Sequence, residues 1–311
     1  MLTVLRAGLQ TTIQAGPRHG FRHFGVPASG PADAVSMALA NRLVGQAADH
    51  PVIETTLTGA SFRFRCEMQI AVTGALADVT LGGRHVELHK TQFVEMDEEL
   101  VIGPAKAGCR NYLALSATLD ADEFLGSRST YLPGKFGGRD GLALADGDAL
   151  AAHDLKEVGD EETPPELKPF FNDRFMLQVS PGPDFNRLGA ASRKRLFEEE
   201  FAASQRASRM GVELTGSKLH LDGEFQKESS AVFPGSVQLP PEGNPYVLLA
   251  DAQTTGGYPH ILQVIRSDRF QLGQIRPGAK IRFVIRSPEE AAERFRSRWE
   301  AYSDWLDQPF I

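Results

Sequence analysis

The stretch "IETTLTGASFRF", residues 53–64, decides the fold class. It contains two short runs of β-branched and aromatic residues with a glycine between them, a pattern typical of β-strands joined by tight turns. The same pattern continues in "QIAVTGA" and "EELVIGP" and returns late in the chain in "FMLQVSPG", "YVLLADA" and "KIRFVIRS". Regular short strands with frequent turns indicate barrels or sandwiches rather than a parallel, doubly wound sheet. We therefore predict a mainly β fold with a few helices (α+β).

Three segments have the apolar periodicity of helices. "ADAVSMALANRLVG", residues 32–45, places apolar side chains at i, i+4 and i+8, and its final glycine suits a helix end. "AASRKRLFEEEFAAS", residues 190–204, has one apolar side. In "SPEEAAERFRSRWEAYSDW", residues 287–305, Ser287 can cap the helix and acidic residues gather near its start. We predict a helix over each of these segments.

One segment differs in composition from the rest of the chain. Residues 151–172, "AAHDLKEVGDEETPPELKPFFN", are acidic, contain a Pro-Pro pair and lack apolar periodicity. These properties are typical of linkers between domains. We predict an N-terminal β-rich lobe over residues 1–155, an acidic linker over 156–171 and a C-terminal β-barrel lobe with a terminal helix over 172–311. A long surface loop inside a single domain is the alternative.

Composition narrows the class of protein. The formal net charge is −7, whereas nucleic-acid binders present a basic face, so we expect no nucleic-acid partner. No apolar run approaches the roughly 18–20 residues that span a bilayer, and no signal-peptide pattern opens the chain, so we expect a cytoplasmic protein without membrane contact. The two cysteines lack metal-ligand spacing and no HExxH motif is present, so no metal site is expected.

The first polar constellation is "TTIQAGPRHGFRHFGVPASGPADAVSMALANRLVG", residues 11–45. Its glycines permit close backbone approach, and an arginine beside them is the usual partner of a carboxylate or phosphate. The helix start that follows adds partial positive charge, so the loop favours an anionic group. A glycine-rich connector with solvent-facing arginines is the alternative. The predicted substrate-binding residues here are Arg18, Gly20, Ser29 and Gly30.

A second glycine-rich stretch, "GSRSTYLPGKFGGRDG", spans residues 126–141. It is not a P-loop, because Gly134 and Lys135 are followed by Phe136 instead of serine or threonine. Any use of ATP would therefore need another kind of site or a partner chain. A mobile surface loop is the favoured interpretation.

The remaining polar constellations lie in the C-terminal half. In "SRMGVELTG", Arg209 fits an anion clamp or a plain turn before a strand, and Asp251 closes an apolar strand before "AQTTGGYPH". A carboxylate at that position either bonds the following turn or is held for chemistry. His260 has the same ambiguity. The predicted catalytic residues are Asp251, Gln253, Thr254 and Thr255, and the predicted substrate-binding residues are Arg209, Gln238, Gly256, Gly257 and Tyr258.

An ordered set of motifs resembles one known family. The motifs include "GVPASGPAD", "IETTLTG", "GSRST", "SRMGVELTG", "PGSVQLPPEGNPYVLLADAQTTGGYP" and "QIRPGAKIRFVIRSPEEA", and they cover nearly the whole chain. They resemble the biotin-dependent carboxyltransferase-like family, which includes the C subunit of bacterial 5-oxoprolinase, KipA-type proteins and the carboxyltransferase region of urea carboxylase. Older labels are allophanate hydrolase subunit 2 and urea amidolyase-related protein. The resemblance implies cyclophilin-like β-barrel lobes.

The resemblance also implies a function. It implies the C subunit of an ATP-dependent complex that hydrolyses 5-oxo-L-proline to L-glutamate, with a KipI-like B subunit and a third, (β/α)-barrel-like subunit. One alternative is a carboxyltransferase component acting on urea or a related amide, with biotin carried by another protein because this chain has no Met-Lys-Met motif. The other is a non-catalytic binder of a KipI-like kinase inhibitor.

Both enzymatic functions act on a small amide, and stabilising the charge that develops on it requires fixed hydrogen-bond donors. We therefore expect Arg18 and Arg209 to bind an anionic group and Asp251 to act as base or orienter. Gln253 and the two following threonines should polarise the amide. The family usually reads Ile-Gln-Asp-x-Gly-Arg-x-Gly, whereas this chain reads "IQAGPRHG", with Ala15 in place of the acid. A further departure is Tyr131, where an acid is common.

Overall fold

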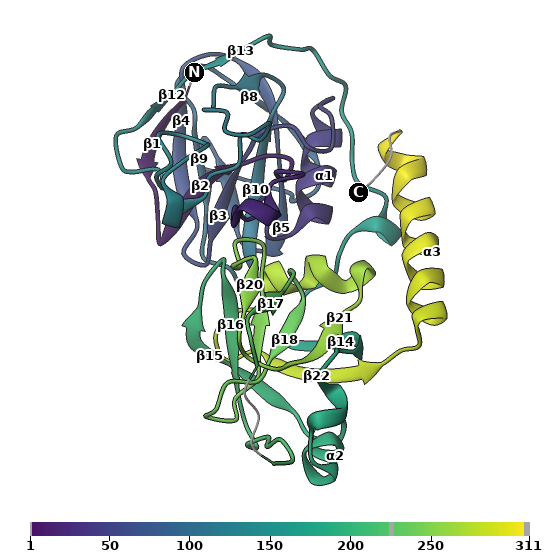
Figure 1. Cartoon of the computed structure of the whole chain (residues 1–311). Helices are drawn as coiled ribbons and strands as arrows, with labels where there is room; N and C mark the ends of the chain where they lie inside the picture. The colour runs from purple at the N-terminus through teal and green to yellow at the C-terminus, as the bar shows by residue number, and fades with distance from the viewer. Residues whose placement is uncertain (1, 224–226, 308–311) are drawn as a thin grey trace. The chain divides into compact units, whose positions relative to one another are not determined.

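The computed structural model describes residues 2–223 and 227–307 (Figure 1). By their internal contacts these residues form two compact units. The first contains residues 2–18, 29–171 and 299–307, and the second contains residues 19–28 and 172–298, apart from the three left out. The segment predicted as a linker, residues 156–171, thus groups with the first unit, and the short segment 19–28 groups with the second.

The first unit is built from two antiparallel sheets. The six-stranded sheet has the order β12-β1-β4-β9-β6-β7, with β1 (Leu2–Arg6), β4 (Ala60–Phe64), β6 (Val79–Leu81), β7 (Arg84–Val86), β9 (Glu99–Ile102) and β12 (Ala149–Leu150). The five-stranded sheet has the order β2-β3-β10-β5-β8, with β2 (Gln10–Gln14), β3 (Val52–Thr56), β5 (Met68–Leu76), β8 (Thr91–Val94) and β10 (Ala107–Leu115). A short ribbon pairs β11 (Thr118–Leu119) with β13 (Ala152–His153).

The two strands of "IETTLTGASFRF" do not pair with each other. β3 pairs with β2 and β10, whereas β4 pairs with β1 and β9, so the chain changes sheets at residues 57–59. Gly59 has a φ of +68°, and a Cβ there would lie 2.0 Å from the carbonyl oxygen of Ile102. Only glycine fits this corner, because a side chain would meet the backbone of the neighbouring strand.

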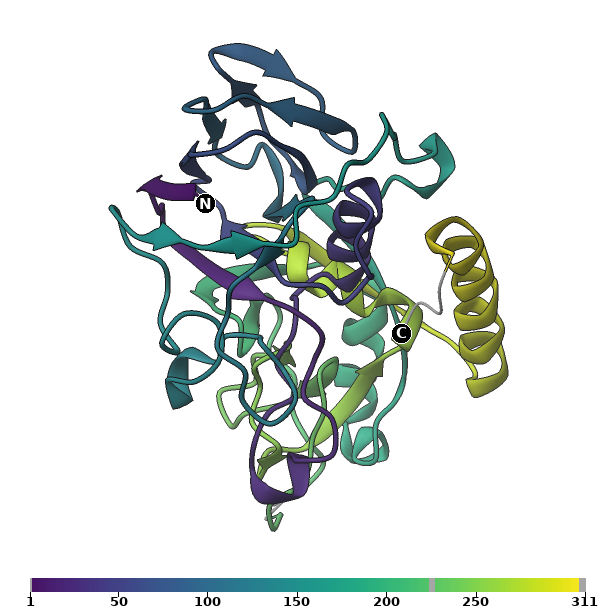
Figure 2. The same cartoon turned by 90° about the horizontal axis from the view of Figure 1, so that it is seen from above.

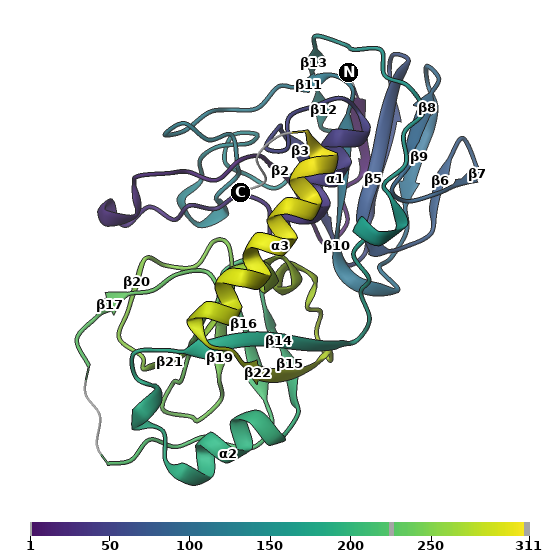
Figure 3. The ribbon, with the colours of Figure 1, turned by 90° about the vertical axis from the view of Figure 1, so that its right-hand side faces the viewer.

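Two apolar cores hold the first unit together. Between the sheets pack Ile13, Ile53, Phe62, Phe64 and Leu113, among others. On the other face of the five-stranded sheet lies α1 (Ala34–Leu43), which packs on β5 and β10 through residues such as Met37 and Leu43 (Figures 1 and 3). β3 is buried along its whole length because it is covered on both faces.

The second unit contains a closed barrel. Its strand order is β14-β21-β18-β19-β16-β15-β22, with β14 (Arg174–Pro181), β15 (Phe201–Ala207), β16 (Gly211–Thr215), β18 (Ser236–Gln238), β19 (Tyr246–Leu248), β21 (His260–Val264) and β22 (Lys280–Ile285). Buried and exposed residues alternate along β14 and β22, so that Leu177 and Phe283 pair on the buried side. A separate ribbon joins β17 (Ser230–Ala231) to β20 (Thr255–Gly256). The prediction of a mainly β fold with a few helices is confirmed.

The predicted helices are present as α1, α2 (Ala190–Glu198) and α3 (Pro288–Leu306). The prediction for residues 190–204 was too long, because Phe201 begins β15 and pairs with Ile281 of the barrel. Barrel pairing there overrides the helical pattern of the sequence. The Ser287 hydroxyl accepts a hydrogen bond from the Glu290 backbone N–H at 3.2 Å, as its predicted capping role requires.

Smaller elements complete the fold. Single-turn and longer 3-10 helices are η1 (Arg22–Phe24), η2 (Leu132–Gly134), η3 (Pro165–Leu167), η4 (Phe185–Arg187) and η5 (Arg266–Gln274). At the end of α3 the Trp305 carbonyl accepts a hydrogen bond from Arg42 Nε of α1 at 3.1 Å; the two helices are yellow and purple in Figure 2. Among the described helices, none is long and apolar enough to cross a membrane.

Candidate active site

A buried ion pair stands where two neighbouring barrel strands meet their loops. Arg209 comes just before β16 and Asp251 follows β19, and these strands are antiparallel partners, with Gly211 opposite Leu248. Arg209 Nε lies 2.8 Å and Nη2 lies 3.1 Å from the two carboxylate oxygens of Asp251. The exposed fractions are 3% and 1%. This bidentate geometry fixes both loops at one end of the barrel.

The ion pair limits the chemistry open to Asp251. Both of its carboxylate oxygens already accept hydrogen bonds from Arg209, and the Asp251 backbone N–H donates to the Arg209 carbonyl at 2.9 Å. The carboxylate is therefore neutralised within the chain and withdrawn from solvent. This arrangement favours the orienting role predicted for Asp251 over the role of base.

The glycine-rich loop that follows Asp251 is held by two glutamines. Gln253 Nε2 donates to Gln238 Oε1 at 3.4 Å, and Gln238 Nε2 donates to the Tyr258 carbonyl at 3.4 Å. A Cβ on Gly256 would lie 2.5 Å from Gln238 Nε2, so glycine is what allows the buried amide to lie against the loop. Through these two hydrogen bonds the buried Gln238 side chain holds residues 253–258 in place.

The exposure of the loop side chains varies along its length. Thr254 is buried, and its carbonyl accepts a hydrogen bond from the Val232 N–H at 3.0 Å. Gln253 is half-buried, Thr255 and Gly257 are exposed, and Tyr258 is 49% exposed. Gln253, Thr255 and Tyr258 are therefore the side chains of this loop that solvent reaches.

A histidine beside the loop has an unused ring nitrogen. His260 lies opposite Gln238 in the β18–β21 pair, so the two side chains share one face. His260 is 7% exposed, and its Nε2 atom is buried with no hydrogen-bond partner among the described residues. Burial lowers the pKa of the imidazole, which favours the neutral form at pH 7.

Two charged residues next to His260 carry no sequence signal that points to a site. Asp184 Oδ2 accepts hydrogen bonds from the His260 backbone N–H at 2.8 Å and from Lys227 Nζ at 2.5 Å. Asp184 precedes η4 and lies 76 residues from His260 in sequence, and the antiparallel pairing of β14 with β21 brings them together. The pair neutralises itself and braces the start of β21.

The segment 19–28 contributes Arg22 to the second unit. Arg22 Nη2 donates to the Val232 carbonyl, and the guanidinium lies 5.2 Å from the ring centre of Phe233. Burial lowers the pKa of Arg22. Gly20 stands in the same segment with open space around its Cα. Because Val232 also bonds Thr254, Arg22 supports the segment after β17 that flanks the 253–258 loop.

Arg18, Ser29 and Gly30 lie in the first unit. Arg18 is 1% exposed, its Nε donates to the Phe124 carbonyl at 3.1 Å and its Nη2 donates to the Ser129 carbonyl. Ser29 is buried with a φ of 54°. Ala15, at the position of the missing acid, is buried and its backbone N–H donates to Ser129 Oγ at 2.9 Å. The predicted residues Arg18, Ser29 and Gly30 thus lie in the first unit, whereas Gly20 and the predicted residues between 209 and 258 lie in the second.

A buried polar network holds the start of α1. Tyr112 Oη donates to Glu54 Oε2 at 2.9 Å and accepts from the Asp33 N–H at 2.7 Å. Asp33 in turn accepts from the backbone and hydroxyl of Ser36, capping the helix. Burial raises the pKa of Tyr112 well above its usual value, so the phenol keeps its proton and its donor role. This network is structural, because all of these side chains are fully buried.

A model of the carboxyltransferase domain, subdomains A and B, matches residues 24–285. The chain belongs to the carboxyltransferase-domain family. The match confirms the family resemblance of the sequence motifs. The matched region includes the whole segment from Arg209 to His260. Among the described residues, no group of three or more His, Cys, Asp or Glu side chains could hold a metal ion.

Individual relatives cover nearly the full chain. The chain is 35% identical to the C subunit of 5-oxoprolinase from Escherichia coli (strain K12) over 291 residues, which is 94% of this chain and 93% of that protein. It is 33% identical to "Urea amidolyase" of Saccharomyces cerevisiae over 91% of this chain but only 16% of that protein. The crystal structure of Kluyveromyces lactis urea carboxylase matches 98% of this chain and 29% of that chain, with a TM-score of 0.93 and 27% identity.

Proposed function

We propose that this chain is the C subunit of an ATP-dependent 5-oxoprolinase, which hydrolyses 5-oxo-L-proline to L-glutamate together with a KipI-like B subunit and a third subunit. The observation that carries the proposal is the 35% identity to the C subunit of E. coli 5-oxoprolinase across 94% of this chain and 93% of that protein. The match covers nearly all of that subunit, whereas the match to the yeast urea amidolyase covers only 16% of that protein.

The loop over residues 253–258 has the chemistry that a lactam needs. Opening the ring places negative charge on the lactam oxygen, and preorganised donors aimed at that oxygen lower the barrier. Gln253 and Thr255 offer such donors at the surface of the loop, and the buried Gln238 amide holds Gln253 in place at 3.4 Å. We assign Gln253 and Thr255 to the lactam carbonyl, and Gln238 to positioning.

The remaining predicted residues have supporting roles in this proposal. The Arg209–Asp251 pair keeps the loop start rigid, since both partners are buried and joined by two hydrogen bonds. Glycines 256 and 257 let the substrate approach the backbone, and Tyr258 covers it. ATP is used by the complex, and because this chain has no P-loop sequence, the ATP site would be of another kind or on a partner chain.

Reconstitution tests the proposal. The chain is co-purified with its KipI-like partner and the third subunit, and L-glutamate is measured after addition of 5-oxo-L-proline with or without ATP. We expect glutamate only when all three chains and ATP are present. An intact, monodisperse complex that makes no glutamate would refute the proposal.

A carboxyltransferase acting on urea is the second candidate. It is favoured by the TM-score of 0.93 to Kluyveromyces lactis urea carboxylase over 98% of this chain. Biotin would arrive on another protein under this alternative. Free carboxybiotin and urea, supplied to the same purified complex, distinguish the two: carboxylation of urea without glutamate formation favours the second candidate.

A further inference from the structure

Two arginines of the second unit stand on one side of η5. Arg266 and Arg269 are three residues apart, and side chains at i and i+3 of a 3-10 helix lie one above the other. Burial of Arg269 and, secondly, the positive charge of Arg266 lower the pKa of Arg269, so the two guanidinium groups lie within electrostatic reach of each other. Because like charges this close repel, a bound anion would stabilise the pair.

Neither arginine has an anionic partner within the described chain. Arg269 Nε is buried and has no hydrogen-bond acceptor among the described residues, so a charged donor is withdrawn from water without compensation. The acid between the two arginines, Asp268, lies on another face of η5. Its carboxylate is 1% exposed and accepts hydrogen bonds from the Gln178 backbone N–H at 3.1 Å and from the Ser267 hydroxyl at 3.2 Å. Asp268 is therefore committed to β14 and its own turn.

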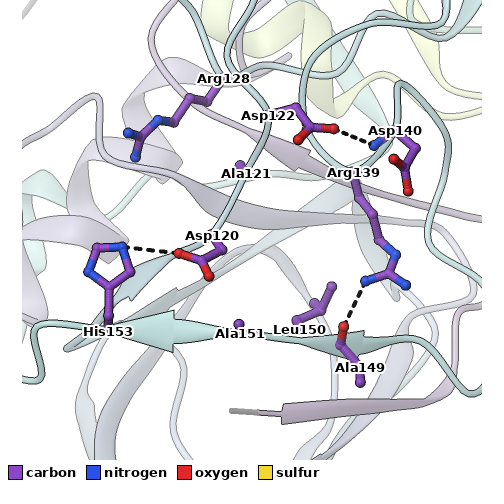
Figure 4. A pocket seen from close by; sticks show the side chains of 11 residues that line it. Asp120, Ala121, Asp122, Arg128, Arg139, Asp140, Ala149, Leu150, Ala151 and His153 are labelled. Carbon is purple, nitrogen blue, oxygen red and sulfur yellow. Dashed lines mark hydrogen bonds and ion pairs between the residues drawn. The ribbon is translucent and has the colours of Figure 1, made fainter.

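Other arginines of the chain find their acceptors internally. In a pocket of the first unit, Arg139 Nη1 donates to the Ala149 carbonyl at 2.7 Å, as Figure 4 shows, and Arg139 Nη2 lies 3.2 Å from Asp148 Oδ1. In the second unit, Arg276 meets both carboxylate oxygens of Asp173, at 2.8 and 2.9 Å. The pair on η5 has no such neutralisation among the described residues.

Phenylalanine rings orient two guanidinium groups at this place. The Arg266 guanidinium lies over the ring of Phe295 on α3, 4.6 Å from its centre, and the Arg298 guanidinium of α3 lies over the ring of Phe270 on η5, at 4.7 Å. A guanidinium over a ring keeps its N–H donors at its edge, where they can still bind an anion. Arg298 makes no hydrogen bond or ion pair with another described residue, so it brings a third available guanidinium to η5.

Three positive groups select among ligand classes. They repel metal ions and ammonium groups, and an apolar ligand would leave the charges without a partner. A nucleic acid is disfavoured by the net charge of −7. A carboxylate brings one charge and two oxygens, whereas a phosphate group brings about two charges and three strong acceptor oxygens. A phosphate group can therefore accept from several guanidinium groups at once.

We propose that Arg266, Arg269 and Arg298 form a binding site for a phosphate group, as free phosphate or as part of a small metabolite. Arg269 supplies the donor already withdrawn from water, Arg266 adds a second charge on the same side of η5, and Arg298 adds donors from α3. All three lie in the second unit. The site shares no residue with the 253–258 loop and does not depend on the proposed enzymatic function.

Equilibrium dialysis of the full chain with radiolabelled inorganic phosphate tests the site, at constant ionic strength in chloride buffer. We expect saturable binding of one phosphate per chain, with acetate at least about tenfold weaker as a competitor. ADP as a competitor distinguishes the two sources of the group. Stronger competition than by unlabelled phosphate assigns the site to a phosphorylated metabolite, and weaker competition assigns it to free phosphate. No saturable binding, or acetate competing as well as phosphate, would overturn the proposal.

Variants assign the binding to η5. Arg266→Gln and Arg269→Gln should each weaken phosphate about tenfold, since each removes a charge-assisted hydrogen bond. Arg266 is exposed, so its variant keeps the test valid if loss of Arg269 disturbs the fold. Arg206→Gln is the matched control, because it removes the same charge from a side chain that is 84% exposed in the same unit. Unchanged binding by both η5 variants, or an equal loss in the control, would contradict the assignment.

Discussion

Removing one charge of the Arg209–Asp251 pair should destabilise the barrel severely. Asp251→Asn keeps the size of the side chain but removes the negative charge that pairs with the Arg209 guanidinium, which is only 3% exposed. Breaking a buried ion pair by removing one partner costs about 3–5 kcal/mol. That is a large fraction of the total stability of a domain, which is about 5–15 kcal/mol.

A double variant distinguishes a role of Asp251 in orienting the loop from a role in the chemistry. Arg209→Met combined with Asp251→Leu removes both charges, and apolar replacement of a buried pair is often close to neutral. We expect the double variant to recover much of the loss of the Asp251→Asn protein. Its turnover in the assembled complex should recover in parallel if Asp251 orients the loop. A stable double variant without turnover would indicate that the carboxylate takes part in the chemistry.

The assay must report on the barrel. Both tryptophans, Trp299 and Trp305, lie in α3, so fluorescence would follow that helix. Hydrogen exchange of peptides from β16 and β19, measured across urea concentrations, follows the strands that carry the pair. A loss under about 1 kcal/mol for Asp251→Asn, or a double variant as unstable as the sum of the single ones, would refute the argument.

Three further predictions concern the fold. Gly59→Ala should lower the free energy of unfolding by more than the roughly 1–3 kcal/mol expected from its positive φ, because the new Cβ also meets backbone. Gly83→Ala is the control, since Gly83 has a φ of +82° and open space around it. Equal losses of stability for the two variants in urea unfolding would contradict the argument that only glycine fits at residue 59. Burial lowers the pKa of His89 to about 4 from 6.5. His89 therefore takes up a proton at a higher pH in the unfolded chain than in the folded one. The free energy of unfolding should fall by about 3 kcal/mol as the pH drops from about 6.5 to about 4. His89→Gln should flatten this part of a Tm-against-pH curve, and an unchanged slope would contradict it. Ser287→Ala should cost about 1 kcal/mol and raise exchange in the first turn of α3; no change there would count against the cap.

The local structure was largely predictable from the sequence. Alternating and β-branched runs identified the strands, and Ser287 marked a helix start that the structure confirms. The sequence could not show that the two runs of residues 53–64 lie in different sheets, because both choices have the same pattern. Phe201 was wrongly assigned to a helix for the same reason: its strand exists through pairing with distant residues.

The sequence predicted which residues form the candidate site, but not which of them contact one another. The motif around Asp251 and Gln253 was visible, but its pairing with Arg209 depends on β16 and β19 being neighbours. Asp184 carries no motif and reaches His260 because β14 pairs with β21, and Lys227 in turn bonds Asp184. The expectation that Arg18 binds an anion stays a prediction; the sequence did not show that its guanidinium is buried and donates to the carbonyls of Phe124 and Ser129.

The most direct test of the account is one substitution in the assembled complex. Gln253→Ala removes a donor that we assign to the lactam oxygen, while Gln205→Ala removes an exposed amide from β15 of the same barrel. Loss of one such donor lowers kcat about 100- to 1000-fold. We predict that fall in ATP-dependent glutamate formation for Gln253→Ala, and wild-type rates for Gln205→Ala. A folded, assembled Gln253→Ala complex with an unchanged kcat would contradict the placement of the lactam site on this loop.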